Sequence, residues 1–215
     1  MGRALIPAFA LGVLLSALPA AADRGALSVD GGGGGTAFQL TPPFTKSTQS
    51  VLATTFNATL GVRYALWDWL ELGVSGFYEP NVPVYYDNVT LSTDNGDFSG
   101  KLGHKFNRFG ALGGAYYKFG SVLRPTLGIE AGWSRRAYSD FHLYDVDDAH
   151  NPIDYHLTLP NFATDNFTLG AVLGLEWCIT DHIGAMASLK PRAMLGPDSR
   201  LSLTGTITLS YSWYL

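Results

Sequence analysis

Apolar and polar side chains alternate along most of this chain. From Leu201 to Leu215, every odd-numbered residue is apolar or glycine, and every even-numbered residue is Ser, Thr or Tyr. Successive side chains of a strand point to opposite faces, so this stretch predicts one strand with an apolar and a hydroxylic face. It continues for 15 residues, whereas strands of water-soluble sheets usually have about 5–6.

The same alternation predicts six further strands, at 55–64, 70–78, 108–119, 126–134, 167–178 and 183–192. An eighth strand is expected between Gly25 and Thr45, with Phe38, Leu40, Pro42 and Phe44 on one face. The predicted fold class is all-β, as an antiparallel up-and-down transmembrane β-barrel of eight strands.

Two features favour a membrane barrel over a soluble one. The apolar faces carry no charge, because every Arg, Lys and Glu of these strands falls on the other face. Several apolar faces also begin and end in aromatics eight to ten residues apart, as in the pairs Phe56 and Tyr64, Phe109 and Tyr117, and Phe167 and Trp177. That spacing corresponds to roughly 20–25 Å along a tilted strand, the height of an outer-membrane apolar band with its aromatic girdles.

The links between the predicted strands alternate in length. Short links lie at 65–68, 120–124 and 179–182, and long ones at 79–105 and 137–165. Outer-membrane barrels have short periplasmic turns and long external loops. With both termini in the periplasm, an eight-stranded barrel places all the short links on that side.

On this evidence the mature chain resembles the small outer-membrane barrels of the OmpA transmembrane-domain and OmpX type. The resemblance implies a location in the bacterial outer membrane, in contact with its lipid and lipopolysaccharide. It also implies that the last strand is a signal for the barrel assembly machinery. In that family this strand ends in an aromatic residue, whereas here Trp213-Tyr214-Leu215 ends in Leu.

The N-terminus predicts a cleaved signal peptide over residues 1–22, which leaves a barrel domain over 23–215. Arg3 supplies a basic start, Ala4 to Leu18 is apolar, and small residues (Ala20-Ala21-Ala22) precede Asp23. This order is typical of a secretory signal.

Composition narrows the classes further. Hydrophobic residues make up 47% and charged residues 15% of the chain, a balance that argues against disorder. The formal net charge of −4 gives no support for a nucleic-acid partner. The run Gly31–Gly35 is followed by Thr36-Ala37 rather than the Lys-Ser or Lys-Thr of a phosphate-binding loop, so flexible backbone or a strand edge is expected.

Charged residues on the hydroxylic faces predict a network inside the barrel. Arg63 and Glu71 are expected to be direct cross-strand neighbours. A barrel of eight strands is just filled by its side chains, so these charges should pair and hold it shut, with an ion path as the alternative. The predicted network consists of Arg63, Glu71, Lys118, Glu130, Glu176, Lys190 and Arg192.

The long links carry two weaker candidates. Asp145, Asp147, Asp148 and His150 could hold a divalent cation, although they lack the Gly and terminal Glu of an EF-hand loop, and a solvated acidic loop is the alternative. A group of aromatics could form an adhesive surface or pack within an ordered loop: Tyr78, Tyr85, Tyr86, Phe98 and Phe106.

The favoured function is a structural or surface-interaction barrel that acts through its external loops. A narrow pore for small solutes is one alternative, and a lipid-modifying enzyme is another. The five His residues lie in predicted loops or turns, and none belongs to a His-x-Ser strand motif. We therefore expect no enzymatic activity, no catalytic residues and no cofactor.

Overall fold

The computed structural model describes residues 24–43, 50–94, 96–146, 152–154, 159–196 and 200–214. The predicted signal peptide lies outside these residues. No helix within the described part of the chain is long and apolar enough to cross a membrane. The strands are β1 (Ala26–Leu40), β2 (Val51–Trp67), β3 (Leu70–Thr93), β4 (Gly96–Lys118), β5 (Leu123–Val146), β6 (Pro152–Asp154), β7 (Phe162–Cys178), β8 (Ile183–Leu195) and β9 (Arg200–Tyr214).

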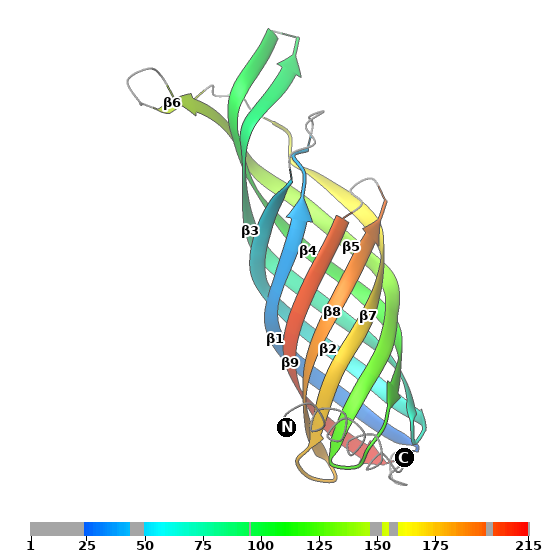
Figure 1. The fold of residues 1–215 in the computed structure, drawn as a ribbon. Coiled ribbons are helices and arrows are strands. Elements are labelled where there is room, and N and C mark those ends of the chain that lie inside the picture. The colour runs from blue at the N-terminus through cyan, green and yellow to red at the C-terminus, as the bar shows by residue number, and fades with distance from the viewer. Residues whose placement is uncertain are drawn as a thin grey trace, which may run out of the picture.

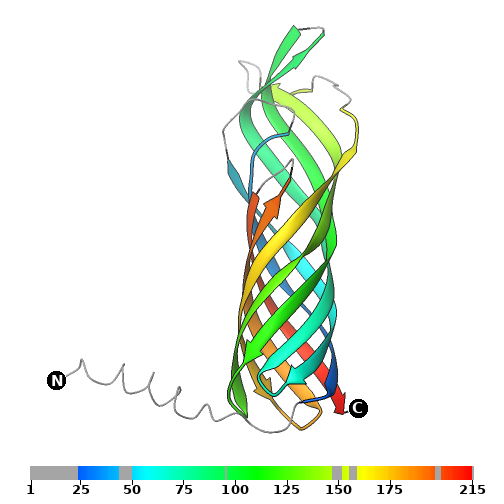
Figure 2. The same cartoon turned by 90° about the vertical axis from the view of Figure 1, so that its right-hand side faces the viewer.

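Eight of these strands form a closed antiparallel ring, which confirms the predicted fold (Figures 1 and 2). Each pairs with its neighbours along the chain, β1 pairs with β9, and the short β6 only adds to β5. Closure removes the free strand edges that would otherwise pair with other chains. The turns after β2, β4 and β7 lie at the same end as residues 26 and 214, as the link lengths predicted.

The two faces of the wall have the predicted characters. On β9, Leu201 and Ile207 point outward and are 61% and 67% exposed, whereas Thr204 and Thr208 point inward and are 0% and 2% exposed. Exposed leucine and buried threonine are the reverse of a soluble protein's pattern. The outer face therefore suits the hydrocarbon of a membrane.

The first strand differs from its prediction. Strand β1 begins at Ala26 and includes the whole glycine run, while Pro42 follows its end and Phe44 lies outside the described residues. The expected face is also turned, since Phe38 and Leu40 are buried inside the barrel. Because a run of glycines shows no alternation, the sequence pattern could not predict the middle of this strand.

The predicted long loops are also largely strand. Strands β3 and β4 continue through most of 79–105 as a hairpin, and β5 continues to Val146. Bulges between Glu79 and Val82, and between Tyr86 and Val89, shift the alternation by one residue and hide it. At these bulges Asn81 and Asn88 have φ values of 45° and 53°, a conformation that asparagine tolerates well.

The resulting projection is called the external extension, and comprises residues 80–93 of β3, 96–107 of β4 and 137–146 of β5. It rises beyond the other strands in Figure 1. The start of the extension can be located on β4. There the outward-facing residues change from the aromatic Phe109 and Tyr117 of the apolar wall to the charged Lys105 and Lys101. The extension therefore stands above the apolar band, outside the membrane.

Candidate functional site

The periplasmic half of the barrel interior holds a cluster of five charges. Arg63 donates from Nε to Asp30 Oδ1 (2.9 Å) and from Nη1 to Glu71 Oε2 (3.0 Å), and its Nη2 lies 3.7 Å from Glu176 Oε1. Lys118 Nζ lies 2.7 Å from both Glu71 Oε1 and Glu176 Oε2. Three acids and two bases from five strands are thereby linked, so the cluster ties the wall together at this level.

Arg63 and Glu71 meet diagonally, not directly across the strands as predicted. Arg63 lies opposite Gly73, and Glu71 lies opposite Ala65, because β2 continues to Trp67 and its link to β3 is shorter than predicted. A Cβ on Gly73 would come within 2.7 Å of Arg63 Cγ, so the glycine makes room for the arginine stem. Because Gly73 has no side chain, the side chain of Arg63 can extend across the lumen to its three acidic partners.

A second cluster lies around Glu130. Its two oxygens accept hydrogen bonds from Lys190 Nζ (3.3 Å) and Arg192 Nη2 (2.9 Å), and the hydroxyl of Tyr116 donates at 3.0 Å. The structure thus brings each of the seven predicted interior charges into one of two clusters. Tyr116 was not expected among their partners.

A third cluster escaped the sequence prediction. Glu79 and Arg108 pair at 3.1 Å with both side chains fully buried, and Glu79 also accepts hydrogen bonds from Thr36 and Asn57. Glu79 was assigned to a loop, and Asp30 of the first cluster stands beside the glycine run. The inward position of Arg108 in the alternation was the one available signal for this cluster.

Hydrophobic side chains close the outer mouth of the barrel. They come from the ends of the barrel strands and from the inner side of the external extension. We call them the outer core, and they comprise Phe38, Leu40, Ala53, Val82, Val84, Tyr86, Val89, Leu91, Leu102, Phe106, Tyr138, Phe141, Leu143 and Met194. Phe38 and Phe106 meet edge to face at 5.5 Å, and Tyr138 stacks on Phe162 at 4.5 Å.

The predicted loop aromatics divide between two environments. Tyr86 and Phe106 are buried in the outer core, and Phe98 packs against it. Tyr78 and Tyr85 are 47% and 64% exposed. Packing within the structure therefore holds for Tyr86, Phe98 and Phe106, and an adhesive surface stays a prediction for Tyr78 and Tyr85.

One imidazole is buried in the outer core. The ring of His104 lies 5.3–6.3 Å, between centroids, from the rings of Tyr86, Phe106, Tyr138 and Phe141. This part of β4 belongs to the external extension and stands outside the membrane-spanning segment. Burial lowers the pKa of His104 to about 4, and the nearby Arg136 charge lowers it further. The imidazole is therefore neutral at neutral pH.

The metal candidates receive no structural test. Asp147, Asp148 and His150 lie outside the described residues, and the side chain of Asp145 is likewise outside them. Within the described ranges, no group of three or more His, Cys, Asp and Glu side chains is placed to hold a metal ion.

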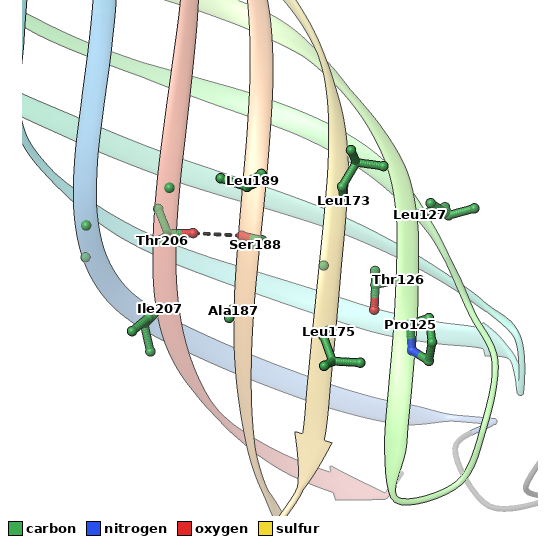
Figure 3. A pocket seen from close by; sticks show the side chains of 14 residues that line it. Pro125, Thr126, Leu127, Leu173, Leu175, Ala187, Ser188, Leu189, Thr206 and Ile207 are labelled. Carbon is green, nitrogen blue, oxygen red and sulfur yellow. Dashed lines mark hydrogen bonds between the residues drawn. The ribbon is translucent and has the colours of Figure 1, made fainter. Parts of the chain in front are cut away.

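A hollow of about 650 Å³ lies on the outer wall across β1, β9, β8, β7 and β5 (Figure 3). Its lining includes Leu127, Leu173, Leu189 and Ile207, all at least half exposed. The hydrogen bond between Thr206 and Ser188 belongs to the inner face behind it. This hollow therefore belongs to the lipid-facing surface and does not open into the lumen.

The fold has known counterparts, although no family model and no curated protein matches the sequence. Neisserial surface protein A is 12% identical and has a TM-score of 0.55, over 87% of this chain and 99% of that one. Ail of Yersinia pestis is 11% identical over 88% and 99% of the two chains (TM-score 0.49). OprG of Pseudomonas aeruginosa is 14% identical over 90% and 98% (TM-score 0.48).

The chain has the fold of a small outer-membrane barrel. Its place is the bacterial outer membrane, as its exposed apolar wall and the fold it shares with Neisserial surface protein A agree. At these identities the likeness is one of fold and does not assign a role.

Proposed function

We propose that this protein is a closed, non-conducting outer-membrane barrel that displays the external extension to a partner outside the cell. The outer core carries the proposal, because it fills the outer mouth of the barrel with buried aliphatic and aromatic side chains. Below it, Arg108, Glu130, Arg63 and Lys118 are each no more than 5% exposed. Interior charges this deeply buried favour a plug held by ion pairs over a water-filled path.

The lengths of the strands support a role outside the membrane. Strands β3, β4 and β5 have 24, 23 and 24 residues, whereas β8 has 13. Crossing the bilayer needs only about 9–11 tilted residues. The additional length builds a folded platform with its own hydrophobic core, a device suited to holding a surface in a fixed position.

Two measurements test the proposal. In planar bilayers the refolded barrel should show little or no conductance. Bacteria that display the wild type should bind other cells or surface material, and a variant in which residues 80–105 are replaced by a short turn should lose that binding. A large conductance whose ion selectivity changes in Glu130→Gln would contradict the proposal and favour the pore.

The remaining expectations are part of the same proposal. The barrel contacts outer-membrane lipid and lipopolysaccharide along its wall, and β9 is the strand that the assembly machinery reads. We propose no enzymatic activity for the barrel. Mass spectrometry of lipid A from cells with and without the gene should accordingly give the same species, and a new or missing acyl chain would point to the enzyme.

A further inference from the structure

A second hollow, of about 420 Å³, lies on the outward side of the external extension. Small-molecule sites occupy roughly 300–1,000 Å³. It is lined by residues from three adjacent strands: Tyr85 on β3, Gly103, His104 and Lys105 on β4, and Asp140, His142 and Tyr144 on β5. Of these residues only His104 also contacts the outer core, where its ring packs on the other side of the sheet.

A cross-strand row sets the shape of this hollow. Tyr85 pairs with Gly103, and Gly103 pairs with His142, so the three residues lie side by side on three strands. Gly103 brings no side chain to the centre of the row. Adjacent strands are about 4.8 Å apart, so a gap of roughly 10 Å separates the backbones of Tyr85 and His142.

The ring of Tyr85 lies over the glycine. Its Cδ1 and Cε1 atoms are each 3.2 Å from the position that a Cβ on Gly103 would take, and the residue is 64% exposed. An exposed tyrosine ring supported from below by backbone is an aromatic platform, on which an apolar face of a ligand can stack.

Polar groups border the platform. Lys105 Nζ lies 3.1 Å from Asp140 Oδ2, with the two side chains 52% and 53% exposed. Asp140 has a φ of 54° at the bulge of β5, and the exposed His142 follows it. The border thus offers N–H donors and carboxylate acceptors side by side, while the Lys105 and Asp140 charges cancel.

We propose that this hollow binds a neutral saccharide. A sugar ring has one face of C–H groups, which suits the Tyr85 platform, and a rim of hydroxyls that donate and accept, which suits Lys105 and Asp140. A strongly anionic or cationic ligand gains little from a border whose charges balance. The inference rests on the proposed surface-interaction function and names the chemistry of its partner.

The test uses the full mature barrel, refolded in micelles of a phosphocholine detergent so that no sugar headgroup competes. Three probes are titrated while their saturation-transfer NMR signals are recorded. The first is a neutral hexose oligosaccharide from the outer part of the lipopolysaccharide core, free of the acidic sugar that links the core to lipid A. The second is a neutral N-acetyllactosamine oligosaccharide of animal cell surfaces. The third is a sulfated disaccharide. Binding of the first or the second identifies the source of the sugar, from the bacterial envelope or from a host cell.

Binding of at least one neutral probe is expected. Tyr85→Ala should weaken it by about tenfold or more, the change that ~1.4 kcal/mol of lost contact produces. Tyr85→Phe should retain binding because the hydroxyl is not part of the platform. Tyr64→Ala, which removes a tyrosine from the lipid-facing wall, is the matched control and should bind like the wild type.

Three results would overturn the inference: no binding of either neutral probe, preference for the sulfated one, or unchanged affinity in Tyr85→Ala. The heat-dependent gel shift of each variant shows that it is folded. If the neutral sugars fail while displayed wild type still binds cells through residues 80–105, the saccharide is wrong and the proposed function stands. Large conductance would contradict the proposed function independently of any sugar.

Discussion

Arg108 reaches Glu79 at 3.1 Å, and neither side chain has any contact with solvent. The second carboxylate oxygen of Glu79 accepts hydrogen bonds from Thr36 (2.8 Å) and Asn57 (2.9 Å). Strands β1, β2 and β4 therefore all bond to one carboxylate on β3. An interaction so buried and so shared is costly to break from one side only.

Arg108→Met should destabilise the barrel by roughly 3–5 kcal/mol, since it leaves the Glu79 charge buried without its cation. The double change with Glu79→Leu should cost less, so a double-mutant cycle should show strong coupling. Urea unfolding in micelles, followed by tryptophan fluorescence, measures both. Lys101→Gln breaks an exposed pair with Asp87 and should cost no more than about 1 kcal/mol. If Arg108→Met and Lys101→Gln lower the unfolding free energy by similar amounts, water must reach the charges inside the barrel.

Leu173→Arg tests the assignment of the lipid face. Leu173 is 52% exposed at the middle of the outward row of β7, where arginine costs about 2–4 kcal/mol near the bilayer midplane. Ser92→Arg, on an exposed position of the external extension, should leave the unfolding free energy unchanged. Unfolding from lipid vesicles provides the measurement. If Ser92→Arg lowers the unfolding free energy as much as Leu173→Arg does, the membrane-spanning part of the barrel has been assigned wrongly.

The glycine run offers a matched pair of substitutions. A Cβ on Gly34 would collide with the carbonyl of Gly205 on β9, whereas a Cβ on Gly35 would meet nothing nearer than the oxygen of Thr55, at 3.8 Å. Gly34→Ala should therefore prevent β1 from closing against β9, and Gly35→Ala should be tolerated. The fraction of chain that shows the heat-dependent gel shift reports closure. Equal yields for the two variants would show that β1 and β9 can separate at no cost.

The buried imidazole predicts a loss of stability in acid. His104 titrates near 4 in the folded protein and near 6.5 when unfolded, so between these values the unfolded chain binds more protons. The stabilisation is complete above pH 6.5 and is lost as the pH falls toward 4, by about 3 kcal/mol in all. Urea midpoints at pH 4, 5 and 7.5 measure it. His104→Phe should remove this part of the pH dependence, and an unchanged dependence would assign it to other groups.

Alternation was enough to predict the wall of the barrel, because the lipid imposes a strict period of two on every spanning strand. It failed where that constraint ends. Beyond the apolar band, the outward residues of β4 become Lys105 and Lys101, and bulges near Asn81 and Asn88 change the period, so strand resembled loop.

The interior partners were predictable only in part. Arg63 and Glu71 were recognisable as inward charges, but their diagonal contact depends on the short link between Trp67 and Leu70 and on the absence of a side chain at Gly73. Asp30 was not predicted as an interior charge, because it lies next to glycines that show no alternation. The hollow at Tyr85 needs three strands in exact register, and no stretch of the sequence contains that information locally.

The pairing of β1 with β9 also dictates when this protein can fold. Their ladder runs from Ala26 opposite Tyr214 to Phe38 opposite Ser202, and so joins the first strand of the barrel to the last. No closed ring can exist until the last strand has been synthesised and exported. Until then the leucine-rich faces of the strands have no lipid to cover them, so the unclosed chain is prone to aggregate, and the ladder beside the glycines is the last to form.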